Sequence, residues 1–504
     1  MKTSRRRFLT HVASVLPGNW LFFASRAADA QTASPHYDVA VVGAGSGGLG
    51  AAIAAARGDL RVLLVEKSDR LGGTAVASGV TMWEPGVGGT GLPFDIYRRL
   101  KTIPEAVSAY SFGRHCMWNG WDAFPGGEYV VDPERRYVDT LQRHGGSGEE
   151  FKRTVCHGVV FDPDAYEGVA RTMLDQTKRC TIATRTTFSS AKVEGNRVAA
   201  LTLADGRQVT ADYFIDATGG GALCAACGCE RMIGREGRQR FNEPSAAETP
   251  NELLNGVTLI YRITPVPDPA IEPLPEGVPT ECWWRQSFPA VSATRYPNGD
   301  YNFNTLPTME GVECLKMAPD EAYAECKRRV YAHWHYVQTN YPEFQRYRID
   351  RMAPALGVRE TYRVVTDYIL TEHDLKAGLS AQQHPDIVTI ADHSVDRHGK
   401  ESGGYEMREP YGVPYRCLIP KGFSNLLVAC RGAGFSSLAA SSCRLSRTIM
   451  QLGQAAGTAT LLAARGHIDL PDVSPEDLRT ALREQHCQLD WPLPDTLRDY
   501  LQTE

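Results

Sequence analysis

The sequence lacks an unbroken hydrophobic run of the length that crosses a bilayer. Its mildly apolar segment near the start, Val12 to Ala24, is interrupted by Pro17, Gly18 and Asn19, whereas a transmembrane helix needs about 20 consecutive apolar residues. A basic excess is also missing, since 54 Lys and Arg residues stand against 59 Asp and Glu. We therefore expect no membrane span in the mature chain and no nucleic acid among its partners.

The 13 cysteines lack the arrangement of a disulfide scaffold. Their number is odd and they are scattered through 504 residues, a length that can bury a core without such links. Cys224, Cys227 and Cys229 form a C-x-x-C-x-C cluster, but no fourth ligand follows at the spacing of a zinc or iron–sulfur site. We expect no metal and interpret the cluster as buried thiols; the alternative is a metal or redox site.

Residues 1–30 have the pattern of a targeting segment. The motif SRRRFLT at 4–10 is followed by the mildly apolar stretch and by Ala28-Asp29-Ala30, a candidate cleavage site. This order is typical of a twin-arginine signal peptide, which carries folded proteins. The segment predicts export by the twin-arginine machinery to the periplasm or the cell exterior; the alternative is a disordered basic tail.

A glycine-rich turn between two strands is the most informative segment. An apolar strand is expected at Tyr37 to Val42, the turn GAGSGG at Gly43 to Gly48, an alanine-rich helix at Leu49 to Ala56, and a second strand at Arg61 to Val65 that ends in Glu66. The glycines allow a tight turn, close approach of a pyrophosphate and close helix packing, while the acid can accept hydrogen bonds from a ribose. The unit predicts dinucleotide binding rather than an inert turn.

The rest of the chain predicts a return to the same sheet. Short alternating runs at 181–186, 190–193 and 198–203 indicate a β-meander, and YFIDATGG at 213–220 leads back to the sheet. The apolar run at 425–430 and a long helix at 444–464, stopped by Gly466, complete it.

Residues 234–393 are rich in proline and aromatic residues and contain a charged helix at 320–340, which indicates an inserted domain. The expected fold is α/β: a Rossmann-like domain with a parallel sheet and β-meander, plus an inserted α+β substrate domain. The expected ranges are 1–30 for the signal peptide, 36–233 with 394–466 for the nucleotide-binding domain, 234–393 for the inserted substrate or cap domain, and 467–504 for a peripheral helical tail.

Four segments, in this order, resemble the FAD-dependent oxidoreductase family of glutathione-reductase-like flavoproteins, relatives of the fumarate reductase and ketosteroid dehydrogenase flavoproteins. They are GAGSGG with Glu66, RLGGTA, YFIDATGG, and VPYRCLIPKGFSNLLVACRGAG followed by CRLSRTIMQLGQAAGTA. The resemblance covers most of residues 36–465 and implies FAD. It also implies noncovalent binding, because no histidine stands where the succinate dehydrogenase relatives attach flavin. Without iron–sulfur spacing, the electron acceptor is expected to be a soluble molecule, a quinone or oxygen.

The resemblance assigns cofactor contacts to particular residues. It implies Gly43, Gly45, Ser46, Gly47 and Gly48 at the pyrophosphate, Glu66 and Lys67 at the ribose, Gly72, Gly73 and Thr74 at the phosphate and ribityl region, Ala217, Thr218 and Gly219 along the adenine side, Arg431 and Gly432 at the ribityl chain, and the backbone of Arg447 and Thr448 near the flavin pyrimidine. At that last place the start of the long helix can stabilise negative charge on reduced flavin. Gly220 and Cys430 depart from the usual family pattern without affecting these positions.

Catalytic candidates follow from the same comparison and from residue chemistry. Arg444 matches a substrate-facing arginine that precedes the last helix in the fumarate reductase relatives. Arg359 and Glu360 are interpreted either as a pair that positions the site or as a structural ion pair.

The imidazole of histidine titrates near neutral pH and can therefore move protons. His393 and His398, with Asp396 between them, are thus candidate acid–base groups. The alternative is that they are solvated loop residues. Asn302 and Asn304 lie two apart on an expected strand, so both could point into one pocket. Gly79 to Gly91, which holds Trp83 and Glu84, is expected to form a loop over the active site.

These observations predict an exported FAD-dependent oxidoreductase that transfers a hydride between the flavin and a polar organic substrate, at a C–OH, C–N or activated C–C bond. One alternative is a flavin-dependent isomerase or hydratase without net redox change. The other is a protein that binds flavin without catalysis.

Overall fold

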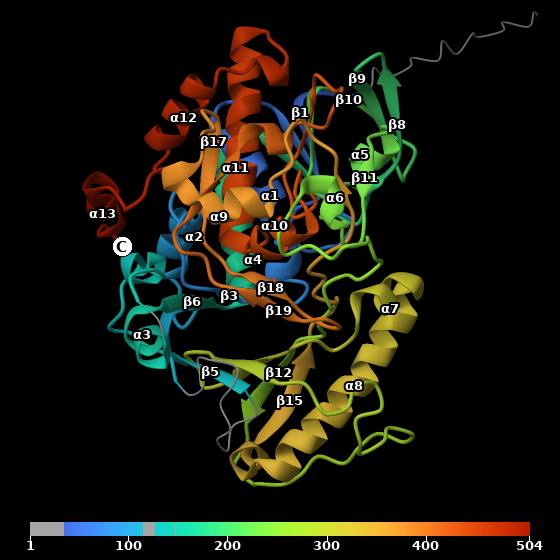
Figure 1. The fold of residues 1–504 in the computed structure, drawn as a ribbon, viewed down its shortest axis with the longest axis vertical. Coiled ribbons are helices and arrows are strands. Elements are labelled where there is room, and N and C mark those ends of the chain that lie inside the picture. Colours follow the sequence, from blue (N-terminus) through green and yellow to red (C-terminus); the bar gives the residue numbers. More distant parts are fainter. Residues whose placement is uncertain (1–34, 114–125, 147) are drawn as a thin grey trace, which may run out of the picture. The chain divides into compact units, whose positions relative to one another are not determined.

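The computed structural model describes residues 35–113, 126–146 and 148–504 (Figure 1). The predicted signal peptide at 1–30 lies outside these residues. Within the described ranges, no helix is both long and apolar enough to cross a membrane.

The first sheet has a parallel core of five strands. β7 (Cys180–Ala183), β2 (Val62–Val65), β1 (His36–Val42), β10 (Gln208–Asp216) and β21 (Leu426–Val428) lie side by side in that order. Residues 39–41 of β1 have no exposed surface, and full burial of each such aliphatic side chain contributes about 1.5–3 kcal/mol. The predicted Rossmann-like sheet is confirmed.

The predicted β-meander is attached to this sheet through one long strand. The first two residues of β10, Gln208 and Val209, precede its parallel part and pair antiparallel with β9 (Arg197–Leu203). β9 in turn pairs with β8 (Phe188–Glu194). The run expected at 181–186 is β7, which joins the parallel sheet beside β2 instead of the meander.

Two glycine-containing helices, α1 (Ser46–Arg57) and α11 (Ser446–Gly466), pack in backbone contact (Figure 1). A Cβ added at Gly50 would lie 2.2 Å from the Met450 carbonyl oxygen, and one at Gly457 would lie 2.3 Å from that of Ala51. No larger residue fits there without separating the helices. The expected stop at Gly466 shifts by one residue, because His467 takes the left-handed conformation that ends α11.

The second sheet has eight strands and combines two distant parts of the chain. Their order is β15 (Tyr347–Met352), β12 (Tyr261–Pro265), β14 (Tyr301–Thr305), β13 (Val291–Arg295), β5 (Gly126–Val131), β4 (Val107–Phe112), β6 (His157–Phe161) and β3 (Met82–Trp83). The parallel pair β13–β5 joins the two halves, and the other pairs are antiparallel. A boundary at residue 234 would therefore cut through one sheet, and the expected ranges remain a prediction.

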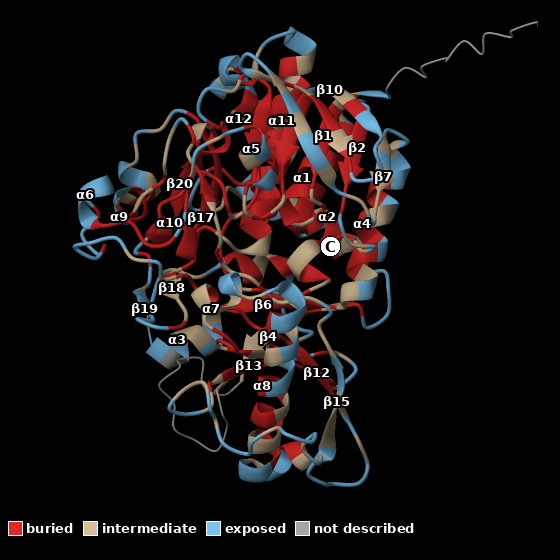
Figure 2. Ribbon diagram, turned by 90° about the vertical axis from the view of Figure 1, so that its right-hand side faces the viewer, coloured by how far each residue is buried: buried red, intermediate tan, exposed pale blue. Residues whose placement is uncertain are grey.

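The charged helix expected at 320–340 is α8 (Pro319–Asn340), which packs against the second sheet. Ala322, Cys326, Val330, Trp334 and Val337 recur every three or four residues and form its buried side (Figure 2). This spacing places them on one face of the helix.

The remaining elements surround the two sheets. They are α2 (Leu92–Leu100), α3 (Gly148–Val155), α4 (Pro163–Thr177), α5 (Ala222–Ala226), β11 (Arg231–Met232), α6 (Arg238–Phe241), α7 (Gly311–Lys316), β16 (Arg363–Val364), α9 (Glu372–Ala381), β17 (Ile387–Ala391), β18 (Val395–Arg397), β19 (Gly403–Tyr405), β20 (Tyr411–Pro414), α10 (Ser437–Ser442), α12 (Pro475–Glu484) and α13 (Asp495–Leu501).

The C-terminal tail is more than the peripheral segment that the sequence suggested. Leu478, Leu482 and Leu501 are fully buried in the main core. Gln488 accepts a hydrogen bond from the Gly88 N–H at 3.1 Å and donates its own N–H to the Thr90 hydroxyl at 2.7 Å. The tail therefore supports the glycine-rich loop at 79–91.

Candidate functional site

A cavity of about 720 Å³ is lined by residues from both sheets. It gathers most of the predicted site residues: Gly43, Gly45, Ser46, Gly47, Glu66, Lys67, Gly73, Thr74, Ala217, Thr218, Gly219, Arg431, Arg447 and Thr448 of the cofactor set, and Arg359, His393, His398 and Arg444 of the catalytic set. Gly48, Gly72 and Gly432 are not part of its lining. Their surroundings indicate packing roles beside it.

The glycine-rich turn needs its glycines for two different reasons. Gly43 has φ +99° and its added Cβ would lie 2.5 Å from the Ala217 carbonyl oxygen, while a Cβ at Gly48 would lie 1.7 Å from that of Gly43. At Gly45 the nearest atom to an added Cβ, the Gly73 Cα, is 4.0 Å away. Gly43 and Gly48 thus let the turn close, whereas Gly45 leaves a bare backbone surface on the cavity.

The loop Gly72–Gly73 is fastened to this turn. The Gly72 N–H donates to the Ala44 carbonyl at 2.7 Å, and a Cβ at Gly73 would lie 2.7 Å from the Gly45 Cα. The two glycine loops therefore touch through their backbones.

Two helices begin at the cavity with open N-termini. Neither α1, which begins at Ser46, nor α11, which begins at Ser446, has a side-chain cap or an acidic residue in its first turn. The N–H groups and the positive dipole ends of both helices can therefore receive negative charge from a ligand.

Glu66 is held at the end of β2 by backbone donors. Its carboxylate accepts hydrogen bonds from the Ala44 N–H at 2.7 Å and the Ser68 N–H at 2.9 Å. A carboxylate has about four acceptor positions, so Glu66 retains capacity for the ribose hydroxyls. The neighbouring Lys67 is exposed and lines the same cavity.

Arg431 supplies a buried cation without an internal partner. Its Nε is buried and has no hydrogen-bond partner in the described part of the chain, and burial lowers the pKa of its guanidinium. A Cβ at Gly219 would come 3.0 Å from this guanidinium. An unpaired buried cation, the bare Gly45 backbone and two open helix termini together fit the anionic dinucleotide that the sequence predicts.

The side chain of Arg447 holds the protein's own loop. It donates to the carbonyls of Glu84, Gly86 and Thr140 and to the Thr140 hydroxyl, the last at 3.1 Å. The backbones of Arg447 and Thr448 lie in the first turn of α11, and both residues line the cavity. This position is compatible with the expectation that they lie near the flavin pyrimidine.

Arg444, Asp396 and His398 form one cluster. The Arg444 Nη2 and the His398 Nε2 lie 2.7 Å and 2.6 Å from the same Asp396 oxygen. Burial would raise the pKa of Asp396, but the hydrogen bond from His398 and the charges of His398 and Arg444 hold it well below its usual value. Arg444 is a partly buried residue in the turn between α10 and α11, with 12% of its side chain exposed.

Arg359 does not pair with Glu360, so both interpretations of that pair are wrong. Glu360 pairs instead with Arg363 and accepts hydrogen bonds from the Asn255 backbone and side chain, each at 3.0 Å. Arg359 turns to the cavity and donates to three neutral oxygens. One of them belongs to Asn304.

Only one of the two strand asparagines reaches the cavity. Asn304 lines it, but the Asn302 amide is occupied with the Gly79 carbonyl at 2.9 Å and the Thr81 hydroxyl at 3.2 Å. The shared face was predicted correctly; the loop at 79–81 covers Asn302.

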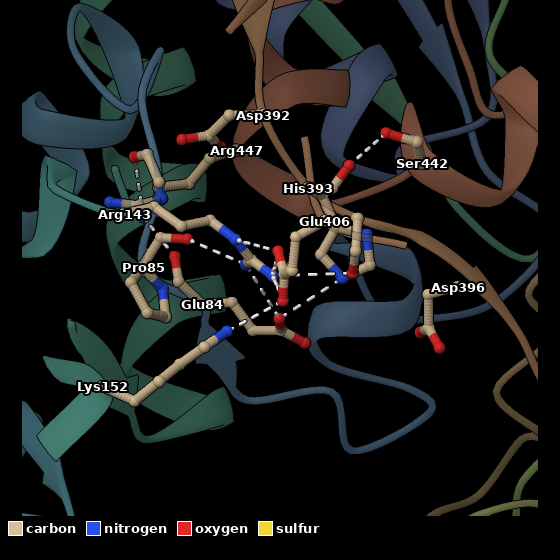
Figure 3. A network of polar contacts seen from close by, with 12 residues as sticks. Glu84, Pro85, Arg143, Lys152, Asp392, His393, Asp396, Glu406, Ser442 and Arg447 are labelled. Atoms are coloured by element: carbon tan, nitrogen blue, oxygen red, sulfur yellow. Dashed lines mark hydrogen bonds and ion pairs between the residues drawn. The ribbon is translucent and has the colours of Figure 1, made fainter. Parts of the chain in front are cut away.

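A second polar network lines the same cavity (Figure 3). His393 Nε2 is 3.3 Å from a Glu84 oxygen, and Arg143 lies 3.8 Å from Glu84 and 3.0 Å from Glu406. Lys152 donates to Glu406 at 2.8 Å. His393 is 5% exposed, and its Nδ1 is buried with no partner among the described residues.

Glu84 remains ionised in this network. Burial would raise its pKa, but the charge and hydrogen bond of His393 and the charge of Arg143 lower the pKa of Glu84 to about 2. Its side chain is 40% exposed, and it lines the cavity. The sequence analysis placed Glu84 in a loop over the site but assigned it no role, and it missed Arg143 and Glu406. The glycine-rich context of Glu84 was the one available signal.

Two thiols of the C-x-x-C-x-C cluster, Cys224 and Cys227, are buried, and Cys229 is partly buried. Burial raises the pKa of both Cys224 and Cys227, the latter to about 12. No group of three or more His, Cys, Asp or Glu residues suited to a metal ion occurs among the described residues.

Comparison with solved structures yields distant likenesses. A geranylgeranyl bacteriochlorophyll reductase-like protein from Thermoplasma acidophilum shares 12% identity, covers 93% of this chain and 96% of its own, and has a TM-score of 0.43. L-Amino acid deaminase from Proteus myxofaciens shares 12% identity over 88% of this chain and 92% of its own, with a TM-score of 0.38. p-Nitrophenol 4-monooxygenase from Pseudomonas putida shares 9% identity over 93% of this chain and 84% of its own, with a TM-score of 0.40. No curated protein matches the sequence.

The family comparison also covers most of the chain. The family described as FAD dependent oxidoreductase matches residues 38–482, a range that includes the glycine-rich turn, both sheets and the whole of α11. The chain belongs to the FAD-dependent oxidoreductase family, and it is a flavin enzyme with FAD as its cofactor.

Proposed function

We propose that this protein is an exported oxidoreductase that transfers a hydride between noncovalently bound FAD and a polar organic substrate, at a C–OH, C–N or activated C–C bond. The observation that carries the proposal is a single cavity. It joins the nucleotide cradle, formed by the two glycine loops and Arg431, to two charged clusters, one around Asp396 and one around Glu84. A soluble molecule, a quinone or oxygen is proposed as the electron acceptor.

Bound FAD would supply the hydride acceptor or donor. It would be held by the backbone at Gly43, Gly45 and Ser46, by Glu66 at the ribose, and by Arg431. The first turn of α11 would stabilise negative charge on the cofactor through its free N–H groups.

His393 is the proposed acid–base group. Its Nε2 faces the ionised Glu84 carboxylate at 3.3 Å, which would orient the ring and favour a proton on Nε2. Its Nδ1 has no partner among the described residues and could accept a proton from a substrate hydroxyl or amine, or return one to it. Glu84 would act as a positioning residue.

The cluster around Arg444 is proposed to orient the substrate. Asp396 fixes the Arg444 guanidinium at 2.7 Å, so the arginine would meet the substrate in one conformation. A group held in a defined position lowers the entropic cost of reaching the reactive geometry.

Export is proposed from residues 1–30 alone. The twin-arginine pattern precedes a domain that binds a cofactor, and the twin-arginine route carries folded proteins. Export by this route is tested by fusing residues 1–34 to a reporter that is active only outside the cytoplasm. The control is the same fusion with Arg5 and Arg6 replaced by Lys. Equal reporter activity with and without the arginines would exclude the route.

The reaction is tested by anaerobic titration of the purified holoenzyme with alcohols, amines and organic acids. A substrate of the proposed kind bleaches the flavin absorption, and an added acceptor restores it. Turnover without bleaching would favour an isomerase or hydratase. A flavin that neither a substrate nor dithionite reduces would indicate a cofactor without catalysis.

A further inference from the structure

Arg359 is a cation on the substrate side of the cavity whose hydrogen bonds all go to neutral groups. Its Nη1 donates to the Gly256 carbonyl at 2.8 Å and the Thr258 hydroxyl at 2.9 Å, and its Nη2 lies 3.4 Å from the Asn304 amide oxygen. All three partners are neutral. No carboxylate of the described chain forms an ion pair with it.

Three other cations of this region are paired with acids of the protein, whereas Arg447 is held by backbone carbonyls and the Thr140 hydroxyl. Arg444 lies against Asp396 at 2.7 Å, while Arg143 and Lys152 share Glu406 at 3.0 Å and 2.8 Å. Arg359 therefore forms no ion pair within the described chain, and the carboxylates of Asp396 and Glu84 act on its charge only without direct contact.

This charge is unfavourable where it stands. Burial, and then the positive charge of Arg444, lower the pKa of Arg359 to about 10, although the charges of Asp396 and Glu84 act in the opposite direction. A buried charge without a counterion is destabilising, and a negative group of a ligand would relieve that cost.

The guanidinium also has unused donors. The Arg359 Nε has no hydrogen bond among the described residues and is not one of the buried unpartnered atoms. With Nη2, which has one long contact, it presents the two-pronged edge that matches the two oxygens of a carboxylate.

We propose that Arg359 binds a carboxylate of the substrate, so that the compound oxidised or reduced at the flavin is an organic acid. This inference deepens the proposed function and rests on it. Asn304 and Thr258 hold the guanidinium in place, and Arg444 adds a second positive charge near the bound carboxylate.

Binding of acid and amide pairs to the holoenzyme tests the assignment without requiring the true substrate. The probes are succinate and benzoate, each with its amide, and inorganic phosphate, followed by calorimetry and by perturbation of the flavin spectrum. We expect the acids to bind at least tenfold more tightly than their amides. Arg359→Gln should remove that preference, Arg359→Lys should retain part of it, and Arg185→Gln on the surface should leave it unchanged.

The results that would contradict the carboxylate assignment can be told apart from those that would contradict the proposed function. Equal affinity for acids and amides in the natural protein, or no measurable binding of either acid, overturns the carboxylate assignment whether or not any variant folds. Tighter binding of phosphate than of the acids also overturns it, in favour of a phosphorylated substrate. If the flavin is bleached by a compound without a carboxylate, the proposed function stands and this inference fails. If no compound bleaches it, the proposed function fails, and the acid–amide comparison still decides what Arg359 binds.

Discussion

Individual glycines of the nucleotide turn differ in what a methyl group would do to them. At Gly45 an added Cβ meets no atom closer than 4.0 Å, whereas at Gly48 it lies 1.7 Å from a backbone oxygen. Gly45→Ala is therefore expected to keep the melting temperature of the apoprotein within a few degrees and to weaken FAD binding about tenfold or more. Gly48→Ala should destabilise the fold itself by about 2–3 kcal/mol.

The two glycine variants are compared by thermal unfolding without FAD and by FAD titration. Equal losses of stability in both would contradict the assignment of Gly45 to the ligand surface.

Asp396 controls the electrostatics of its cluster. Burial and the charge of Arg359 lower the pKa of His398, and Asp396 works against that decrease. Asp396→Asn should therefore lower the pKa of His398 further and reduce kcat/KM by tenfold or more, because Arg444 loses its fixed position. Titration of His398 by NMR and steady-state kinetics measure the two effects. Asp469→Asn, which removes a partner of Arg197 on the surface, is the control and should change neither.

The sequence predicted the site residues that lie in short, recognisable segments. Arg444 was found because it precedes a family-like motif, and His393 and His398 because imidazole groups suit proton transfer. Arg143 and Glu406 are 263 residues apart, and neither has a neighbouring motif that marks it. Their pairing depends on the packing of β4, α3 and β19, which no local pattern reveals.

At the scale of the element, the start of α9 is fixed by one buried acid. Glu372 is fully buried and accepts hydrogen bonds from the Ser245 N–H at 2.8 Å, the Tyr405 hydroxyl at 2.7 Å and the Lys376 ammonium at 2.5 Å. Burial would raise its pKa, but these partners lower the pKa of Glu372 to about 2. Its carboxylate therefore stabilises the fold above about pH 4.5, and this contribution is lost as the pH falls toward 2.

Glu372→Gln should reduce the free energy of unfolding at pH 7 by about 2–3 kcal/mol. The gap in unfolding free energy between the variant and the natural protein should narrow as the pH falls from about 4.5 toward 2, since Glu372 is protonated in the unfolded chain first and in the folded protein only near pH 2. Denaturant unfolding at several pH values measures this difference in unfolding free energy. The matched control is Glu194→Gln, a substitution of an exposed glutamate. A gap independent of pH would exclude ionisation of Glu372 as its source.

The C-terminal helix α12 is expected to stabilise the core. Leu478 and Leu482 lie four residues apart and are both fully buried. Leu482→Ala should cost about 2–4 kcal/mol of unfolding free energy, whereas Arg483→Ala on the exposed side should cost less than about 1 kcal/mol. Chemical denaturation compares the two. Equal small losses would mean that the tail packs only loosely.

Elements with local signals were predicted well and long-range pairings were not. The alanine-rich helix and the second strand were expected at 49–56 and 61–65, and the structure has α1 at Ser46–Arg57 and β2 at Val62–Val65. The second sheet escaped detection because its halves meet through β5 and β13, whose residues are over 150 positions apart in the sequence and pair in parallel. Short strands of mixed polarity do not identify their partners.

The whole molecule places a nucleotide cradle, a proposed proton-transfer pair and an unpaired cation around one cavity. The cradle lies at the carboxyl ends of β1, β2 and β10, where ligands bind in open parallel sheets. The second sheet contributes Asn304 and Ser292 to the opposite wall. The account therefore depends on a dissociable flavin that occupies the first half of the cavity and leaves the second half to the substrate.

The visible absorption spectrum of the purified, folded protein, before and after acid precipitation, tests this most directly. We predict a yellow protein with flavin absorption bands, whose acid supernatant contains free FAD and whose precipitate is colourless. Yellow colour that stays with the precipitate would contradict noncovalent binding. A colourless protein that takes up no added FAD would contradict the assignment of the cavity to the flavin.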